Sequence, residues 1–386
     1  MSCRQHKKSV LALLLIALLN LTEVALCAED LVLEGVYEAA LDLPRILFLL
    51  KRSPNGPPLT YQGRFQRNYA FLDTGASGVL LSRETANFLQ LAVEPNAQFV
   101  DVGVGGEEYF DVSEPLYIGL ADYEENRAHD PNVYTVLGPG RFQIKRNTAG
   151  LLAEPIDVVG MPALAGQIIV LNSGATNNLG YFTADIKERG DPAIPVSDIV
   201  VTLRFANFLN PNNPNNTGPL PVTAYNPVID NIIITHNDKT STANWLFDTG
   251  ATISLISTEQ AGKLGLTNKN GKPIGRPDFS LPVGGIGSMV LIPGFEIDRL
   301  TVPTLSGRNL VFKNARIGVH DIRYFDEKRG EYTVLDGIFG SNFLCASAKM
   351  EGLLPSDIGS TVFDNIILDM EKGLVGFDIS DYHTQH

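Results

Sequence analysis

The stretch FLDTGASGVLLS spans Phe71–Ser82, and a near copy, LFDTGATISLIS, spans Leu246–Ser257. Each copy places an Asp-Thr-Gly turn between one apolar, strand-like segment and a second apolar run. A single turn of this kind is weak evidence, because Asp and Gly are common turn residues. Two copies in matching surroundings indicate an internal repeat in which the turn has a role in both halves.

The repeat extends well beyond the turn. Residues Asp73–Leu91 align without a gap to Asp248–Leu266, 175 positions later. Two further pairs of segments recur in the same order, Val102–Gly106 (VGVGG) with Val283–Ser288 (VGGIGS) and Ile156–Gly160 (IDVVG) with Asp336–Gly340 (DGIFG). The chain is therefore predicted to contain one domain written twice.

The composition between these motifs favours β structure. Short Val/Ile/Leu/Phe/Tyr runs alternate with Gly, Pro and Asn clusters, and helical periodicity is scarce. The clearest linker signal is NPNNPNNTGPLP at Asn210–Pro221. We expect a mainly β protein of two similar lobes, with a first lobe at 28–206, a linker or loop at 207–221 and a second lobe at 222–386.

The N-terminus has the pattern of a secretory signal peptide over residues 1–27. A basic head, MSCRQHKK, precedes a ten-residue apolar run and the small residues of a cleavage site. Cleavage after Cys27 and cleavage after Ala28 both fit. A lipoprotein anchored through Cys27 is an alternative that the bulky Leu26 disfavours. The protein is expected to be secreted or periplasmic.

Charge and cysteine content exclude several classes of protein. The chain has a formal net charge of −13, and without residues 1–27 it has 27 basic and 42 acidic residues, a net charge of −15. Such a surface disfavours nucleic acid and anionic lipid as partners. Cys3 and Cys27 are expected to leave with the signal peptide, so Cys345 has no intramolecular disulfide partner and is predicted to be a buried apolar residue.

The duplicated aspartates suggest a reaction that needs two carboxyl groups. Two carboxyl groups that share a proton can accept a proton from an attacking water and donate one to a substrate carbonyl oxygen. Such a pair requires equivalent surroundings on both sides of an approximate two-fold axis. Asp73 and Asp248 are the predicted catalytic pair.

The residues next to each aspartate are predicted to support the loops. Gly75 and Gly250 allow a tight turn that brings backbone N–H groups onto the carboxylates. The short hydroxyls of Thr74 and Thr249 are placed to bind the opposite loop and lock the two turns together. The apolar residues on either side bury both loops.

Each loop is followed by a predicted short helix. Ser82 and Ser257 are the expected N-caps, and Glu84 and Glu259 stand in the favourable first turn. Ser257 and Gln260 also satisfy the sequence pattern of a capping box.

These motifs together resemble the aspartic peptidases, the group of pepsin and the retroviral proteases. The resemblance covers both halves through the two D-T-G-A-S/T motifs and two hydrophobic-hydrophobic-Gly elements, Val158–Gly160 and Ile338–Gly340. In that family the second element runs behind the active-site loop. The C-terminal VFDNIILDMEKGLVGF resembles the final hairpin of the family, with its turn at Asp369–Gly373.

Two details favour the retroviral branch of the family. Ala76 and Ala251 stand where pepsin-like enzymes usually carry Ser or Thr, and both halves have a Gly-rich candidate flap where those enzymes have one main flap with a Tyr. Tyr109 is the tyrosine nearest that position. Unlike retroviral enzymes, this chain holds both halves. The candidate flap glycines are Gly103, Gly105, Gly106, Gly284, Gly285 and Gly287.

The resemblance implies an exported, bilobal aspartic endopeptidase that acts as a monomer on protein or peptide substrates in a cleft between the lobes. Water is the nucleophile, and no metal or organic cofactor is implied. The alternative is a catalytically silent peptide- or glycan-binding protein on the same fold.

The Gly-rich segments lack a G-K-[ST] ending and a following helix, so we expect hairpin tips there instead of phosphate loops. Trp245 is expected in the core.

Overall fold

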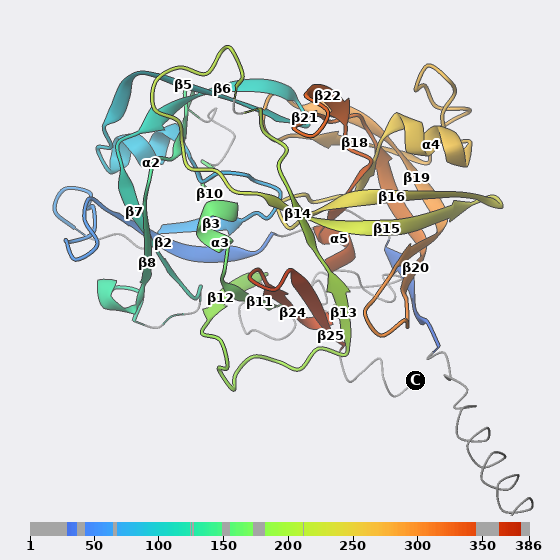
Figure 1. Cartoon of the computed structure of the whole chain (residues 1–386), viewed down its shortest axis with the longest axis horizontal. Coiled ribbons are helices and arrows are strands. Elements are labelled where there is room, and N and C mark those ends of the chain that lie inside the picture. The colour runs from blue at the N-terminus through green and yellow to red at the C-terminus, as the bar shows by residue number, and fades with distance from the viewer. Residues whose placement is uncertain are drawn as a thin grey trace, which may run out of the picture.

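The computed structural model describes most of the chain as a mainly β protein (Figure 1). None of the described helices is long and apolar enough to cross a membrane. The predicted signal peptide, all three cysteines and the C-terminal tail lie outside the described residues. These are 29–36, 43–64, 68–123, 125, 127–148, 155–172, 182–210, 212–344 and 363–379.

The described strands form two large sheets and one small ribbon. Fourteen described strands form the first sheet: β2 (Arg45–Lys51), β3 (Asn68–Leu72), β4 (Leu80–Leu81), β5 (Val93–Gly103), β6 (Gly106–Ser113), β7 (Leu116–Ala121), β8 (Thr135–Gly140), β9 (Gln143–Lys145), β10 (Val158–Val159), β11 (Ile168–Asn172), β12 (Thr183–Lys187), β13 (Ile199–Thr202), β24 (Phe363–Asp369) and β25 (Leu374–Ile379).

Nine described strands form the second sheet: β1 (Leu31–Val36), β14 (Arg204–Ala206), β15 (Asn226–His236), β16 (Lys239–Asp248), β17 (Leu255–Ile256), β18 (Phe279–Val283), β19 (Val290–Val302), β20 (Leu310–Val319) and β23 (Gly337–Gly340). β21 (Arg323–Asp326) pairs with β22 (Glu331–Val334) as a separate ribbon. In Figure 1, β15, β16, β19 and β20 lie on the right and β2, β7 and β8 on the left.

The helices are short, as the sequence predicts. They are α2 (Arg83–Phe88), α3 (Met161–Leu164), α4 (Thr258–Leu264), α5 (Ser341–Leu344) and the 3-10 turn η1 (Pro131–Val133).

Both predicted N-caps are confirmed. The hydroxyl of Ser82 accepts a hydrogen bond from the Thr85 N–H, and that of Ser257 accepts one from the Gln260 N–H. The reciprocal half of the predicted capping box is wrong. The N–H of Ser257 donates to the carbonyl of Asp336, while the Gln260 side chain bonds to Asp336 and Ser241.

Each end of the described chain pairs with strands of the sheet that is built mainly by the other half of the sequence. β1 pairs in parallel with β20 in the second sheet, although it precedes the first half of the sequence. β24 and β25 form the predicted C-terminal hairpin, and it joins the first sheet through β11 and β13. Each half of the sequence therefore supplies strands to the sheet built mainly by the other.

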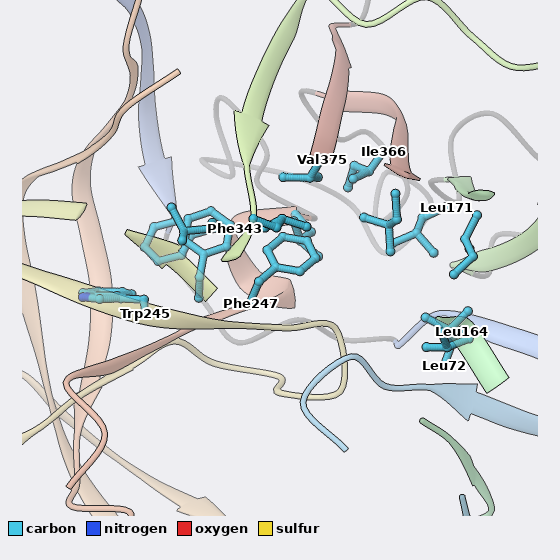
Figure 2. Close-up of a cluster of buried hydrophobic side chains, with 14 of the residues drawn as sticks. Leu72, Leu164, Leu171, Trp245, Phe247, Phe343, Ile366 and Val375 are labelled. Carbon is cyan, nitrogen blue, oxygen red and sulfur yellow. The ribbon is translucent and has the colours of Figure 1, made fainter. Parts of the chain in front are cut away.

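The largest apolar core joins residues from both sheets. Figure 2 shows Phe247 and Phe343 between Trp245 on one side and Leu72 and Leu164 on the other. Trp245 is fully buried, which confirms its predicted place in the core. Because Leu72 and Phe247 directly precede the two aspartates, this core lies under both turns.

Candidate active site

The two Asp-Thr-Gly turns sit in matching frameworks. The first turn connects β3 to β4, and β10 lies between these strands, parallel to β3 and antiparallel to β4. The second turn connects β16 to β17, and β23 lies between them in the same way. These short strands are the hydrophobic-hydrophobic-Gly elements, so the prediction that they run behind the turns is confirmed.

The glycines that end these elements make room for the turns. A Cβ on Gly160 would overlap the carbonyl oxygens of Ala76 and Gly78, and one on Gly340 would lie 2.9 Å from the carbonyl oxygen of Ala251. Close backbone approach, therefore, explains why Gly closes each element.

The two turns are joined by four reciprocal hydrogen bonds of the threonines. The Thr74 hydroxyl donates to the Phe247 carbonyl at 2.7 Å and accepts the Thr249 N–H at 3.1 Å. The Thr249 hydroxyl donates to the Leu72 carbonyl at 2.7 Å and accepts the Thr74 N–H at 3.1 Å. Both threonines are fully buried. The predicted locking of one turn by the other is confirmed.

Each aspartate accepts two backbone hydrogen bonds from its own turn. Asp73 Oδ1 accepts the N–H groups of Gly75 at 2.8 Å and Ala76 at 3.0 Å. Asp248 Oδ1 is held in the same way by Gly250 at 2.9 Å and Ala251 at 3.1 Å. In both carboxyl groups Oδ1 is thereby fixed.

The glycines of the turns bring the two carboxyl groups together. A Cβ on Gly75 would overlap the carboxyl group of Asp248, and a Cβ on Gly250 would overlap that of Asp73. Neither glycine has a positive φ, so the close approach of the opposite aspartate requires Gly here. The predicted reason, a tight turn, is only part of the explanation.

Burial raises the pKa of both aspartates. At Asp73 the loss of water dominates, and it is partly offset by hydrogen bonds from Asp248 and from the N–H groups of the turn. The pKa of Asp248 lies well above its ordinary value because burial and the charge of Asp73 act in the same direction. Two carboxyl groups in hydrogen-bonding contact can hold one proton between them.

Each turn has additional support that the repeat does not predict. At the first turn, Asn226 Nδ2 donates to the carbonyls of Thr74 and Gly75, each at 3.0 Å, and its Oδ1 accepts the Ser77 hydroxyl at 2.6 Å. At the second turn, the Ser341 hydroxyl donates to the Thr249 carbonyl at 2.7 Å. Ser341 directly follows the IFG element, and its position there was the only sequence signal for it.

The Gly-rich segments form two hairpin tips that contact each other. The first tip joins β5 to β6, and the second joins β18 to β19. The Gly105 N–H donates to the Ile286 carbonyl at 3.0 Å, and the Ser288 N–H donates to the Gly105 carbonyl at 3.3 Å. The predicted hairpins are confirmed, and we call these two tips the flaps.

The flap glycines differ in what they allow. Cβ atoms on Gly105 and Gly287 would overlap the backbone of the opposite flap, and one on Gly103 would lie 2.7 Å from Ile286 Cβ. Gly106 has a φ of 100°, which its turn requires. Gly284 and Gly285 are less restricted, with no protein atom closer than 3.1 Å to an added Cβ.

The flap tips cross into the opposite halves. Val104 of the first flap packs against an apolar cluster that also contacts Ala251, and Ile286 of the second flap packs against the cluster that contacts Ala76. A ring nitrogen of His320 lies 2.9 Å from the Val104 carbonyl oxygen. Tyr109 is exposed beside Arg146, so it is not placed over the aspartates.

Other candidate sites find no support in the described residues. Among these residues, no group of three or more His, Cys, Asp or Glu side chains is placed to hold a metal ion. No helix follows directly on either flap tip in the described chain.

No protein-family model matches the sequence, and no curated protein matches it.

Proposed function

We propose that the protein is an aspartic-type endopeptidase that hydrolyses peptide bonds with a water molecule activated between Asp73 and Asp248. The observation that carries the proposal is the paired geometry of the two carboxyl groups. Each is fixed by two N–H groups of its own turn and lies against the glycine of the other turn. The reciprocal threonine hydrogen bonds hold this geometry rigid.

The chemistry follows from one proton shared by two carboxyl groups. The ionised member accepts a proton from water as the water oxygen attacks the peptide carbonyl carbon. The protonated member donates to the carbonyl oxygen, which gives a neutral gem-diol intermediate. A proton is then transferred to the leaving nitrogen as the C–N bond breaks. Because the proton moves within the pair, the acid and base roles belong to both residues together.

The wider proposal is a bilobal enzyme in the manner of the aspartic peptidases, complete in one chain and active as a monomer. A substrate strand would lie between the aspartates and the two flaps. We propose that the chain is exported through its N-terminal signal, and that hydrolysis requires no cofactor. The two-fold relation of the turns supports this arrangement, since both halves of the site come from one chain.

The direct test replaces each aspartate with its uncharged isostere. Asp73→Asn and Asp248→Asn should each lower kcat on a mixed peptide library by more than about a hundredfold, because either change prevents proton sharing. Asp238→Asn is a matched control at an exposed turn. Circular dichroism should show that all three variants keep the native fold.

Statine-type peptides provide an independent test, since their hydroxyl replaces the attacking water. They should inhibit the wild-type protein, whereas chelators and serine- or cysteine-directed reagents should not. If either single aspartate variant keeps near-normal turnover, the pair is not catalytic. If the wild-type protein binds peptides without cleaving them, it is the silent binding protein.

A further inference from the structure

A third carboxyl group lies in the first flap near the proposed catalytic pair. Asp101 is on β5 and is only 6% exposed. Its Oδ1 accepts the Val102 N–H at 2.8 Å, and its Oδ2 accepts Gln143 Nε2 at 3.2 Å. Gln143 in turn packs against the first turn, where a Cβ on Gly78 would lie 2.7 Å from the same amide nitrogen. Asp101 is thus connected through Gln143 to the loop that carries Asp73.

The strand register shows which way Asp101 faces. Asp101 pairs with Glu108 across the hairpin, and Phe99 pairs with Phe110. Alternate residues of a strand, and directly paired residues, share one face of a sheet. Phe99 and Phe110 belong to the apolar cluster that contacts Ala76 of the first turn. Asp101 and Glu108 therefore lie on the inner face of the first flap.

These carboxylates are the first side chains on that face behind the flap tip. The inner positions nearer the tip are the paired Gly103 and Gly106, which have no side chains. In the structure Ile286 of the second flap fills the space under Gly103. When the flaps open, a peptide backbone can pass under these glycines, and one of its side chains then meets Asp101 and Glu108 before it meets Phe99.

Asp101 has no cationic partner among the described residues. Glu108 accepts the Gly287 N–H at 2.9 Å and lies 3.8 Å from Lys145 Nζ, but no described ion pair includes Asp101. Burial, with the charges of Glu108 and Asp73 in addition, raises the pKa of Asp101 to about 6. A buried carboxylate of this kind is stabilised when a ligand brings a positive charge to it.

We propose that Asp101 is a specificity-determining residue that selects substrates with a lysine or arginine next to the scissile bond. The charged end of the basic side chain would bind the Asp101 carboxylate, which lies in front of Phe99. On the second flap the inner-face residues behind the tip are the apolar Leu281 and Val283, which pack on the cluster that contacts Ala251, so this preference belongs to the Asp73 side of the site alone. The inference rests on the proposed peptidase function.

The test uses synthetic peptides that are identical except for arginine, lysine, norleucine or glutamine beside the scissile bond. At pH 7, kcat/KM for the arginine and lysine peptides should exceed that for the norleucine peptide about tenfold, the scale of one charge-assisted hydrogen bond. In Asp101→Asn this ratio should fall close to one. Glu107→Gln makes the same charge change on the exposed face of the hairpin, and it should keep the wild-type ratio.

The pH dependence of the ratio gives a second readout on the wild-type protein. The basic side chain binds the ionised form of Asp101, so the preference should rise as the pH increases through the pKa of Asp101 and should be nearly absent at pH 4.5. Titration of Asp73 and Asp248 affects both peptides alike and cancels in the ratio. Glu108 from β6 and Lys145 from β9 also face this region, and Asp101→Asn identifies which carboxyl group sets the change. If that variant fails to fold, the wild-type pH series decides the matter.

The outcomes separate this inference from the proposed function. If the wild-type protein cleaves peptides with the same ratio before and after Asp101→Asn, or with no preference for basic residues, the inference is wrong and the peptidase stands. If nothing is cleaved, fluorescence anisotropy with the labelled arginine and norleucine peptides decides. A binding preference that Asp101→Asn removes supports the subsite in a non-catalytic protein, whereas equal binding overturns both proposals.

Discussion

At the scale of single residues, the Thr249 hydroxyl has a testable energetic role. Thr249→Val removes the partner of the Leu72 carbonyl and of the Thr74 N–H, both in the buried space between the turns. Each unsatisfied buried group costs about 1–3 kcal/mol. We expect the free energy of unfolding to fall by about 2–4 kcal/mol, as measured by denaturant titration. Thr249→Ser keeps the hydroxyl and should lose much less, and a loss well below about 1 kcal/mol in Thr249→Val would show that the hydroxyl contributes little.

Ala76 should influence the pH range of the proposed reaction. A hydroxyl at this position would lie beside the N–H group that binds Asp73 Oδ1 and could donate to the ionised carboxylate. Donation to the charged form lowers a carboxyl pKa, whereas burial raises the pKa values of Asp73 and Asp248. In Ala76→Ser, both limbs of the pH profile of kcat/KM should therefore move to lower pH, by roughly half a unit to one unit.

The matched control for this change is Ala76→Cys, which adds a similar volume but only a weak donor. Its limbs should stay near those of the wild-type protein. We also expect the wild-type optimum at mildly acidic to neutral pH, because Ala76 and Ala251 offer no hydroxyl. Unmoved limbs in Ala76→Ser would mean that other groups set the pKa values of the pair.

At the scale of elements, the flaps combine a tight contact with little hydrogen bonding. Two backbone hydrogen bonds join the tips, those of Gly105 and Ser288, and the Gly287 N–H binds the side chain of Glu108. Elements that are held by a small number of solvent-exposed hydrogen bonds open locally at low free energy. The flaps should therefore open and close readily in the free protein, although the structure shows them in contact.

Hydrogen exchange tests this prediction. Amides at Gly103–Gly106 and Gly284–Gly287 should exchange fast in the free protein and at least about tenfold more slowly with a statine-type inhibitor bound. Amides in the hairpin of β24 and β25 serve as the internal control and should be unaffected. If the flap amides are equally protected in the free and the inhibitor-bound protein, the flaps are ordinary hairpins that do not close over a ligand.

The elements formed by neighbouring residues, such as the two turns, are the part of the fold that the sequence could predict. Asp73, Asp248 and their Thr and Gly neighbours follow from the repeat, because the same local pattern builds the same turn twice. Asn226 lies beyond the linker and has no counterpart in the repeat. The inward direction of Asp101 depends on the register of β5 with β6, which a strand pattern alone leaves open.

At the scale of the molecule, both sheets should unfold together because the largest core includes residues of each. Leu120 on β7 is 1% exposed in the first sheet, and Leu120→Ala should cost about 2–5 kcal/mol. Trp245 is the only tryptophan, and it lies in the second sheet. Its fluorescence should therefore report the same shift in the denaturation midpoint as circular dichroism. An unmoved fluorescence midpoint would show that the halves unfold independently.

The long-range pairings could not be predicted, since sequence periodicity defines strands and not their partners. The pairing of β1 with β20 joins residues about 280 positions apart, Leu31 with Leu310 among them. The hairpin of β24 and β25 was expected from its sequence, but its place beside β11 was not. Register across such distances is decided by packing in the complete molecule.

The crossing of the chain ends has a consequence for assembly. An arrangement in which each half lends strands to the other is the one that two separate half-length chains would form by exchanging their ends. Such a pair would come apart on dilution, and its proposed active site, which takes one aspartate from each half, would be lost with it. In a single chain the two halves are covalently connected. Each half therefore meets the other at a fixed effective concentration, and no bimolecular encounter is needed. Both aspartates therefore stay in register at any dilution, and the two halves of the site are free to diverge, as Asp101 of the first flap and Asn226 at the first turn show, neither of which the repeat matches.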